Sequence, residues 1–426
     1  MRRAVVLGSV LGAVATVNGY RPLSRRAIPS VFAFMSGLFV SELPLQVVTA
    51  QVVPLIATTR RLGSRTRTLV WLSAAGSWLG LLGLHRIGQS ADTPLTTALD
   101  EQLGRDRRKQ SAGLWSGRPP GSGTAKSPGL LRMMRVYRDY AHDSDISYGA
   151  HGRKNELDIW RRPDLARDAR APVLLQIPGG AWATGNKRGQ AHPLMSHLTE
   201  LGWVCASINY RLSPRSTWPD QIVDVKAAIT WVKKHIAEYG GDPNFIAITG
   251  GSAGGHLSSL AALTANDPAF QPGFEDADTD VQAAVPFYGV YDFTRTDDSL
   301  NPAMVPFLER LVIKQTRAEA PHAFEAASSI TYAHPGAPPF FVLHGSNDSF
   351  IPVAQARSFV ARLREVSEQP VVYAEMPYAQ HAFDTFGSAR AAHAAVAVEQ
   401  FLAEIYTKYR AAERALVRKG VQHADS

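Results

Sequence analysis

Three residues of the sequence have the side-chain types that nucleophilic catalysis requires, and Ser252 is the first of them. It stands in Gly250-Gly251-Ser252-Ala253-Gly254, directly after the apolar run 246–249. In a G-x-S-x-G pattern a strand turns sharply into a helix, so the serine hydroxyl stands clear of the sheet. A Cβ atom on either outer glycine would collide with the neighbouring strand and helix. Because a chain with 34 glycines can contain this pattern by chance, Ser252 needs partners elsewhere in the sequence.

Asp348 and His381 supply such partners, each just after another apolar run (340–344 and 371–375). A carboxylate can hold the Nδ1–H group of an imidazole and stabilise the charged ring that forms when Nε2 takes a proton from serine. Taken alone, Asp348 can be a turn residue that caps a helix near Pro352, and a single loop histidine is more often structural. The order Ser252, Asp348, His381, each after a separate strand, is that of the α/β-hydrolase triad.

A loop of small residues, Pro178-Gly179-Gly180-Ala181-Trp182, follows the apolar run 173–177. Small residues allow backbone N–H groups to point into a cavity, as an oxyanion hole requires. A phosphate-binding loop is excluded, because Asn186-Lys187 stands where a lysine and then a serine or threonine are needed. A plain strand-ending turn remains the alternative interpretation.

Short β-branched runs alternate with helical patterns over the last two thirds of the chain. Amphipathic helices are predicted around Ile222 to Ile236 and around Phe359 to Val366. The alternation predicts a mostly parallel sheet with helices on both faces, in which ligands bind beyond the carboxyl ends of the strands. The predicted strands are 155–160, 173–177, 204–210, 245–249, 283–288, 340–344 and 371–375.

Residues from about 145 to 405 resemble the hormone-sensitive-lipase-type carboxylesterases of the α/β-hydrolase fold. The resemblance rests on these motifs: Pro178-Gly179-Gly180-Ala181-Trp182, Asn209-Tyr210-Arg211-Leu212-Ser213-Pro214, Asp242-Pro243, Gly250-Gly251-Ser252-Ala253-Gly254-Gly255, His344-Gly345-Ser346-Asn347-Asp348 and His381-Ala382-Phe383. It implies a serine ester hydrolase that acts on acyl esters without a metal or an organic cofactor.

By position, the resemblance makes Ser252 the nucleophile, His381 the base and then the acid, and Asp348 its orienting partner. The oxyanion would receive backbone hydrogen bonds from Gly180, Ala181 and Ala253. Two departures affect the H-G-G-G motif of the family: Pro178 replaces the histidine and Ala181 the third glycine. The donors are backbone groups, so Ala181 is expected to serve, while the support of the loop must come from elsewhere.

Three apolar stretches precede this region. Residues 4–17 read as a signal peptide or a first span, 28–58 as a span that Pro44 kinks, and 69–84 as a second arm of a membrane hairpin. An N-terminal hairpin on such a domain resembles the membrane-anchored Lip esterases of actinobacteria. We therefore expect an integral cell-membrane protein that acts on lipophilic acyl esters.

Basic residues predict on which side of the membrane the catalytic region lies. Arg60, Arg61, Arg65 and Arg67 connect the two arms of the hairpin and favour a cytoplasmic loop, which places the catalytic region outside the cytoplasm. The cluster of Arg21, Arg25 and Arg26 would then lie on the outer side, against the charge rule.

Four segments are expected: a membrane-anchoring region (1–88), a Gly/Pro/Arg-rich linker (89–130), a catalytic domain (131–410) and a charged tail (411–426). Glu42, Gln46 and Thr49 would line one helical face inside the membrane. We interpret them as packing residues, or Glu42 as an interfacial residue beside Pro44, rather than as a proton or substrate path. An amphipathic helix from Met304 to Val312 is expected to form part of a lid or to cover the sheet.

Charge and cysteine content exclude other classes of protein. The net charge of +8 comes from the first 130 residues, where sixteen Lys and Arg face five Asp and Glu (+11), which leaves −3 for the remainder. That basic excess flanks apolar stretches, so nucleic-acid binding is not expected. The single cysteine, Cys205, excludes a disulfide framework and is read as a buried strand residue.

Three alternatives to ester hydrolysis remain. An acyltransferase would use the same triad with an alcohol acceptor. A non-catalytic ligand-binding relative is disfavoured because all three triad residues are present, and a peptidase because the sequence lacks the extra propeller or charged subsite of such enzymes. Three other residues are interpreted as structural: His256, Arg211 and Asp224.

Overall fold

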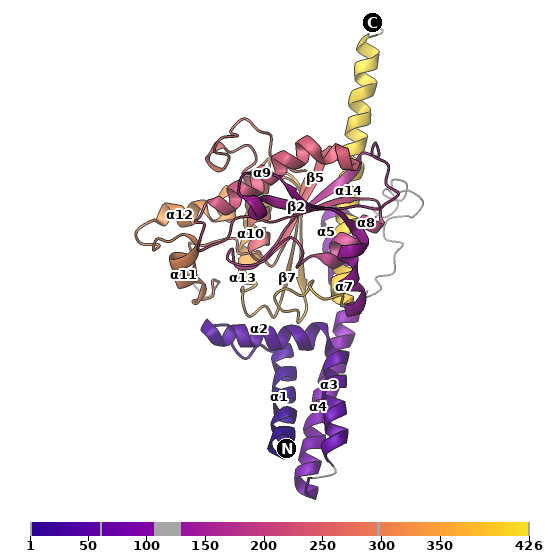
Figure 1. Cartoon of the computed structure of the whole chain (residues 1–426), viewed down its shortest axis with the longest axis vertical. Helices are drawn as coiled ribbons and strands as arrows, with labels where there is room; N and C mark the ends of the chain where they lie inside the picture. Colours follow the sequence, from indigo (N-terminus) through magenta and orange to yellow (C-terminus); the bar gives the residue numbers. More distant parts are fainter. Residues whose placement is uncertain (1, 60–61, 106–128, 296–298, 425–426) are drawn as a thin grey trace.

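The computed structural model describes residues 2–59, 62–105, 129–295 and 299–424. It consists of a sheet domain with helices on both faces and a smaller set of N-terminal helices that project from one end of that domain (Figure 1).

The sheet domain is built on eight strands in the order β1-β2-β4-β3-β5-β6-β7-β8. The pairs β1/β2 and β2/β4 are antiparallel, and the pairs from β4 to β8 are parallel. This confirms the predicted mostly parallel sheet. The strands are β1 (Ala141–Ser147), β2 (Glu156–Trp160), β3 (Ala171–Ile177), β4 (Val204–Ile208), β5 (Gly241–Gly251), β6 (Ala283–Phe287), β7 (Phe340–Gly345) and β8 (Val371–Met376).

Strand β1 was not predicted. Its sequence, Ala-His-Asp-Ser-Asp-Ile-Ser, has no apolar run, and it pairs along one side only, at the edge of the sheet. Strands buried on both faces carry continuous apolar runs, whereas an exposed edge strand does not need one.

Helices cover both faces of the sheet, since successive strand residues point to opposite faces. Val173 and Leu175 belong to one buried cluster and Leu174 to the other. The first face packs against α9 (Asp220–His235), α10 (Ala253–Leu263) and α13 (Ala354–Val366). The second face packs against α5 (Asp92–Leu103), α8 (His192–Glu200) and α14 (Ala389–Ala424). The predicted helices around Ile222 and Phe359 are therefore confirmed as α9 and α13.

Shorter elements complete this domain. Helix α7 (Gly129–Tyr140) leads into β1, and α11 (Met304–Phe307) and α12 (Pro321–Ala326) lie between β6 and β7. The predicted helix from Met304 to Val312 is α11 followed by a π turn, and its buried residues Leu308 and Val312 belong to the core. The single-turn elements are η1 (Gly152–Asn155), η2 (Ile236–Tyr239), η3 (Pro268–Phe270), η4 (Leu308–Val312) and η5 (Ser329–Tyr332).

The N-terminal helices are α1 (Arg2–Tyr20), α2 (Ala27–Glu42), α3 (Pro44–Thr59) and α4 (Ser64–Gln89). By length and composition, α1 and α4 can each cross a membrane, and α2 with α3 forms a further candidate only if the bent pair counts as one span. The kink predicted at Pro44 within 28–58 is confirmed, because the two halves meet there at 95°, while the crossing of the membrane by this segment stays a prediction. Helix α2 lies across the top of α1, beneath the sheet domain, and α4 runs past the end of α2 toward that domain (Figure 1).

Two expected segments differ from what the structure shows. Part of the predicted linker, Asp92–Leu103, is helix α5, whose Leu95 and Leu99 are buried in the core. The predicted tail beyond residue 410 continues helix α14 to Ala424. Helix α5 is charged but amphipathic, and packing of its apolar side on the core stabilises it. Residues 411–416 of α14 are mostly exposed. Residues 106–128, the rest of the Gly/Pro/Arg-rich stretch, lie outside the described residues.

Candidate active site

Ser252 stands at the sharp turn between β5 and α10. Its backbone lies at φ 59° and ψ −119°, a conformation that non-glycine residues seldom adopt. Neither outer glycine of the pattern can carry a side chain without a steric clash. A Cβ on Gly250 would lie 2.5 Å from the carbonyl carbon of Gly254, and a Cβ on Gly254 would lie 2.1 Å from the carbonyl oxygen of Ile177 in β3. The predicted collision with the neighbouring strand and helix is confirmed.

Asp348 and His381 come together after β7 and β8, the last two strands of the sheet. Nδ1 of His381 donates a hydrogen bond of 2.7 Å to Oδ2 of Asp348, and the residues are 5% and 2% exposed. Oδ1 of Asp348 accepts bonds from the backbone N–H groups of Phe350 (2.9 Å) and Ile351 (2.7 Å). With Nδ1 engaged, Nε2 of His381 is the nitrogen left for a reacting group.

Electrostatics keep Asp348 ionised. Burial alone would raise the pKa of the Asp348 carboxyl. The charge of His381 and hydrogen bonds from His344 and His381 outweigh burial and hold the pKa below its ordinary value. A carboxylate that stays charged can stabilise an imidazolium throughout the neutral pH range.

The loop after β3 lies directly against the serine turn. A Cβ on Gly179 would lie 2.5 Å from the Gly251 oxygen and 3.2 Å from Cβ of Ser252. Gly180 has φ 126° and Ala181 φ 52°. Within the part of the chain that the structure describes, neither residue donates a backbone hydrogen bond. Ala253 opens helix α10, so its N–H is also free of helical partners.

Two contacts support this loop where the family histidine is replaced by Pro178. The N–H of Gly179 donates to Oε1 of Gln190 (2.7 Å). Nε1 of Trp182 donates to Nδ1 of His256 (3.1 Å), and Nε2 of His256 donates to the Ala327 carbonyl (2.6 Å). Burial lowers the pKa of His256 to about 4, so the ring is neutral and accepts the Trp182 bond. The structural role predicted for His256 is confirmed.

Tyr288 joins the serine turn to the histidine, and sequence reasoning missed it. Its ring centroid lies 4.6 Å from that of His381, and a Cβ on Gly251 would lie 2.6 Å from its hydroxyl oxygen. That hydroxyl donates to the partly buried carboxyl of Asp384. Tyr288 directly follows β6, the same position after a strand that singled out Asp348 and His381, so this signal could have found it.

Phe34, far away in the sequence, was also missed. Its ring on α2 packs edge-on against His381, with centroids 5.6 Å apart, and stacks on Phe350 at 6.0 Å. No motif in an apolar helix marks such a residue, because the contact exists only after the helix has docked on the domain.

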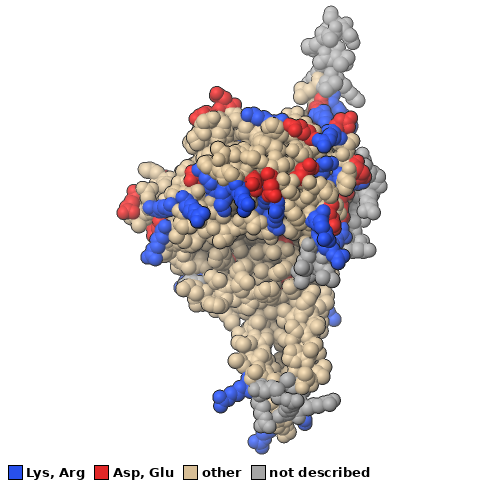
Figure 2. Space-filling view, viewed as in Figure 1, with Lys and Arg blue, Asp and Glu red and all other residues tan. Residues whose placement is uncertain are grey.

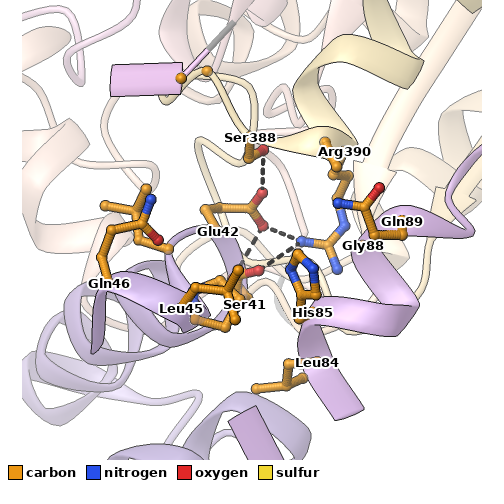
Figure 3. Close-up of a pocket in the computed structure, with 15 residues that line it drawn as sticks. Ser41, Glu42, Leu45, Gln46, Leu84, His85, Gly88, Gln89, Ser388 and Arg390 are labelled. Atoms are coloured by element: carbon orange, nitrogen blue, oxygen red, sulfur yellow. Dashed lines mark hydrogen bonds and ion pairs between the residues drawn. The ribbon is translucent and has the colours of Figure 1, made fainter. Parts of the chain in front are cut away.

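A second polar cluster lies where the N-terminal helices meet the domain. Glu42 forms an ion pair with Arg390 and accepts a bond of 2.7 Å from the Ser388 hydroxyl (Figure 3). The chain bends at Leu43, and the Thr49 hydroxyl donates to the Leu45 carbonyl of its own helix. The expected stripe of Glu42, Gln46 and Thr49 therefore does not run along one helix. Glu42 lies beside the break before Pro44, and its position at a membrane interface stays a prediction.

The other residues singled out in the sequence have structural contacts. Arg211 donates from Nε to Asp224 (2.9 Å) and from an Nη to Asp220 (2.7 Å), which ties the loop after β4 to α9. Cys205 is fully buried in β4, and burial raises the pKa of its thiol to about 12. The structural interpretations of Arg211, Asp224 and Cys205 are confirmed.

Comparisons with known proteins agree with this geometry. Residues 157–363 match the BD-FAE family model. The chain is 65% identical over 408 residues to the probable carboxylic ester hydrolase LipM of Mycobacterium tuberculosis, covering 96% of this chain and 94% of LipM. It is 48% identical over 393 residues to the esterase LipQ of the same organism, covering 91% and 88% of the two chains.

A solved esterase structure shows the same fold. The esterase Est2 of Thermogutta terrifontis aligns with a TM-score of 0.53 and 23% identity over 66% of this chain and 94% of that chain. The protein is thus a carboxylic ester hydrolase that belongs, with the mycobacterial Lip esterases, to the hormone-sensitive-lipase-like carboxylesterases of the α/β-hydrolase fold.

Proposed function

We propose that the enzyme hydrolyses lipophilic acyl esters by two-step acyl transfer through Ser252, His381 and Asp348. Ser252 Oγ attacks the ester carbonyl carbon while Nε2 of His381 takes its proton. The new C–O bond creates an oxyanion, which accepts hydrogen bonds from the N–H groups of Gly180, Ala181 and Ala253. When the carbonyl re-forms, the bond to the alcohol breaks and His381 returns the proton to the leaving oxygen. A water molecule then attacks the acyl-enzyme with His381 as the base, and the carboxylic acid is released as Ser252 regains its proton.

The observation that carries this proposal is the bond of 2.7 Å from Nδ1 of His381 to the buried Asp348 carboxylate. It leaves Nε2 of His381 as the base, and Tyr288 touches both the His381 ring and Gly251, the residue before Ser252. Removal of one oxyanion donor typically costs about 2.7 to 4 kcal/mol of transition-state stabilisation, so the backbone of the Gly180 loop contributes to catalysis beside the triad.

Fluorophosphonate labelling tests the proposal. Wild type should be labelled, and Ser252→Ala and His381→Ala should not. A folded wild-type protein that takes no label would disprove it. Scanning p-nitrophenyl esters of increasing length then measures acyl preference, and product analysis with added alcohols separates hydrolysis from acyl transfer to an alcohol.

We also propose that the N-terminal helices anchor the enzyme in the cell membrane, with the catalytic domain outside the cytoplasm. In support, all exposed large apolar side chains among the described residues, except Tyr378 and Leu416, lie between Leu7 and Leu82. Charged side chains gather on the upper part of the sheet domain, while the front of the helices below it is mostly uncharged down to basic residues at its lower end (Figure 2). Those basic residues mark the cytoplasmic end of the bundle.

The arrangement of α1 supports its retention in the mature protein. Its Thr16 hydroxyl bonds to that of Ser77 on α4 (2.8 Å), and Tyr20 donates to the Gly80 carbonyl (2.8 Å). We propose that residues 1–88 form the anchor and that the catalytic domain comprises α5 together with residues from about 131 to 410. Reporter fusions after Arg86 test the orientation, and activity of a cytoplasmic reporter alone would contradict it.

A further inference from the structure

Helix α2 packs over the two loops that carry Asp348 and His381. Beside Asp348, the Ser349 hydroxyl donates to the Ser30 carbonyl (3.1 Å). Beside His381, the side chain of Gln380 fills the space next to Gly37, where an added Cβ would lie 2.8 Å from its amide nitrogen. Phe34 packs directly on the imidazole of His381. One face of α2 is therefore part of the wall around the reacting groups.

The end of α1 contacts the same loops. Nδ2 of Asn347, the residue before Asp348, donates to the carbonyls of Gly19 and Tyr20 at 2.9 Å each. Tyr20 packs edge-on against Tyr378, which precedes His381 by three residues, at 5.5 Å. The N-terminal helices are thus fastened to both catalytic loops, so they position α2 over the site rather than lying beside it.

The opposite face of α2 is apolar and exposed. The exposed fractions are 71% for Ile28, 72% for Phe32, 44% for Met35 and 43% for Phe39. Glu42, the one charged residue of α2, is buried in its ion pair with Arg390. Exposed arginines precede the helix (Arg21, Arg25 and Arg26). An apolar helix face with basic residues beside it is typical of a helix that lies in the interfacial layer of a membrane.

The arrangement of the N-terminal helices also places α2 in the interfacial layer. Helix α2 lies at 95° to α3, and α1, α3 and α4 run side by side away from the domain (Figure 1). If α1 and α4 cross the bilayer, α2 lies parallel to its surface, because α3 runs beside them and meets α2 at 95°. The mostly uncharged surface of the lower molecule is continuous with that of the spanning helices (Figure 2). The occupant of the outer face of α2 is therefore lipid.

We infer that α2 lies in the interfacial layer of the bilayer and that lipid ester substrates reach Ser252 from the bilayer, past Phe34. The inference rests on the proposed function and deepens it by naming the substrate class: esters whose acyl chains reside in a membrane. An interfacial helix lies about 5 to 10 Å deep, at the boundary of headgroups and acyl chains. That boundary holds the ester carbonyls of membrane lipids, and Phe34 lies between it and His381. Phe34 is then a specificity-determining residue.

Fluorescence quenching tests the location of α2. An environment-sensitive dye is placed on Phe32→Cys in the full chain, reconstituted in phosphatidylcholine and phosphatidylglycerol vesicles. Cys205 is fully buried and does not compete for the dye. Lipids with brominated chains should quench the dye at position 32, but not a dye on Asp164→Cys, an exposed residue of the sheet domain. Equal emission with and without brominated lipid at position 32 would overturn the inference. Excimer emission from pyrene attached at position 32 would also overturn the inference, because it would show that a second copy of the chain, and not lipid, covers this face of α2.

Substrate preference tests the role of Phe34. Phe34→Ala should change the ratio of kcat/KM for long-chain over short-chain esters by about tenfold or more, since a change of pocket size by one methylene is already worth about 10-fold or more. Phe32→Ala, on the outer face of the same helix, should keep the wild-type ratio. An unchanged ratio in Phe34→Ala would overturn the assignment.

Labelling by a water-soluble fluorophosphonate separates failure of the inference from failure of the proposed function. If Phe34→Ala is labelled like wild type but its chain-length ratio does not change, Ser252 is a working nucleophile and only the route past Phe34 is wrong. If wild type itself takes no label, the proposed function fails, and the substrate assignment fails with it.

Discussion

Arg390 at the start of α14 and Glu42 at the end of α2 form an ion pair whose side chains are 1% and 0% exposed. The pair joins positions 348 residues apart in the sequence and fastens the bend between α2 and α3 to the catalytic domain. The Ser388 hydroxyl also donates to Glu42, and Arg390 donates to the Pro377 carbonyl, so both members have further partners. Through this contact the N-terminal helices and the catalytic loops form one structure.

Glu42→Ala should lower the free energy of unfolding by about 3 to 5 kcal/mol, because it leaves the Arg390 charge buried without its partner. Thermal unfolding of the full chain in detergent measures the change. Glu365→Ala is the control: it removes an exposed pair with Arg362, which should be worth less than about 1 kcal/mol. Equal effects of the two substitutions would show that burial of the Glu42 pair has no energetic consequence.

Asp348→Asn should lower kcat by about 10⁴-fold, because an amide no longer holds His381 in the tautomer that presents a free Nε2, nor stabilises the charged ring. Hydrolysis of a p-nitrophenyl ester measures the loss, and the melting temperature shows whether the variant is folded. Asp164→Asn, at an exposed aspartate paired with Arg162, should behave as wild type. A folded Asp348→Asn with near-normal kcat would remove Asp348 from the triad.

The loop after β3 allows a paired test of the oxyanion hole. A Cβ on Gly180 would lie 2.3 Å from the Thr184 oxygen, and the backbone there has φ 126°. Gly180→Ala should therefore displace the N–H donors and lower kcat by about 10² to 10³-fold. Ala181→Gly should keep activity near that of wild type, since Ala181 already has φ 52° and glycine adopts this conformation more readily. The opposite pattern would show that these N–H groups do not bind the oxyanion.

Stability should fall as the pH drops below neutrality, in part through His256. Burial lowers the pKa of His256 from 6.5 to about 4. Between these two values the unfolded chain binds a proton that the native protein does not, so acidification favours unfolding. The full effect, present above pH 6.5 and lost by pH 4, is about 3 kcal/mol for this residue.

Melting temperatures measured from pH 7 to pH 5 check the prediction for His256. His256→Gln should give a flatter pH dependence than wild type, whatever its stability at pH 7. His322→Gln replaces an exposed histidine and should leave the pH dependence as it is. His197 contributes a slope of the same sign, since burial lowers its pKa to about 4 as well, so some pH dependence should remain. A wild-type slope in His256→Gln would contradict the prediction.

The sequence by itself determined the sheet domain and the candidate triad. Local patterns sufficed for both: apolar runs of strand length, helical spacing, and glycines at a turn that excludes a Cβ. Ser252, Asp348 and His381 could be singled out because a parallel sheet brings the carboxyl ends of its strands to one edge. The edge strand β1 lacked such a pattern, and Asp92–Leu103 was hidden in a charged stretch although its apolar side packs into the core.

Only the tertiary structure decided how the N-terminal helices meet the site. Pro44 predicts a kink in the apolar run from 28 to 58, but the sequence does not record that the chain turns there by 95°. The contact of Phe34 with His381 and the pairing of Glu42 with Arg390 join residues more than 340 positions apart. Such contacts depend on the docking of whole elements. The charge of Glu42 within an apolar stretch could be noticed in the sequence, but no local pattern identifies Arg390 as its partner or Phe34 as a neighbour of His381.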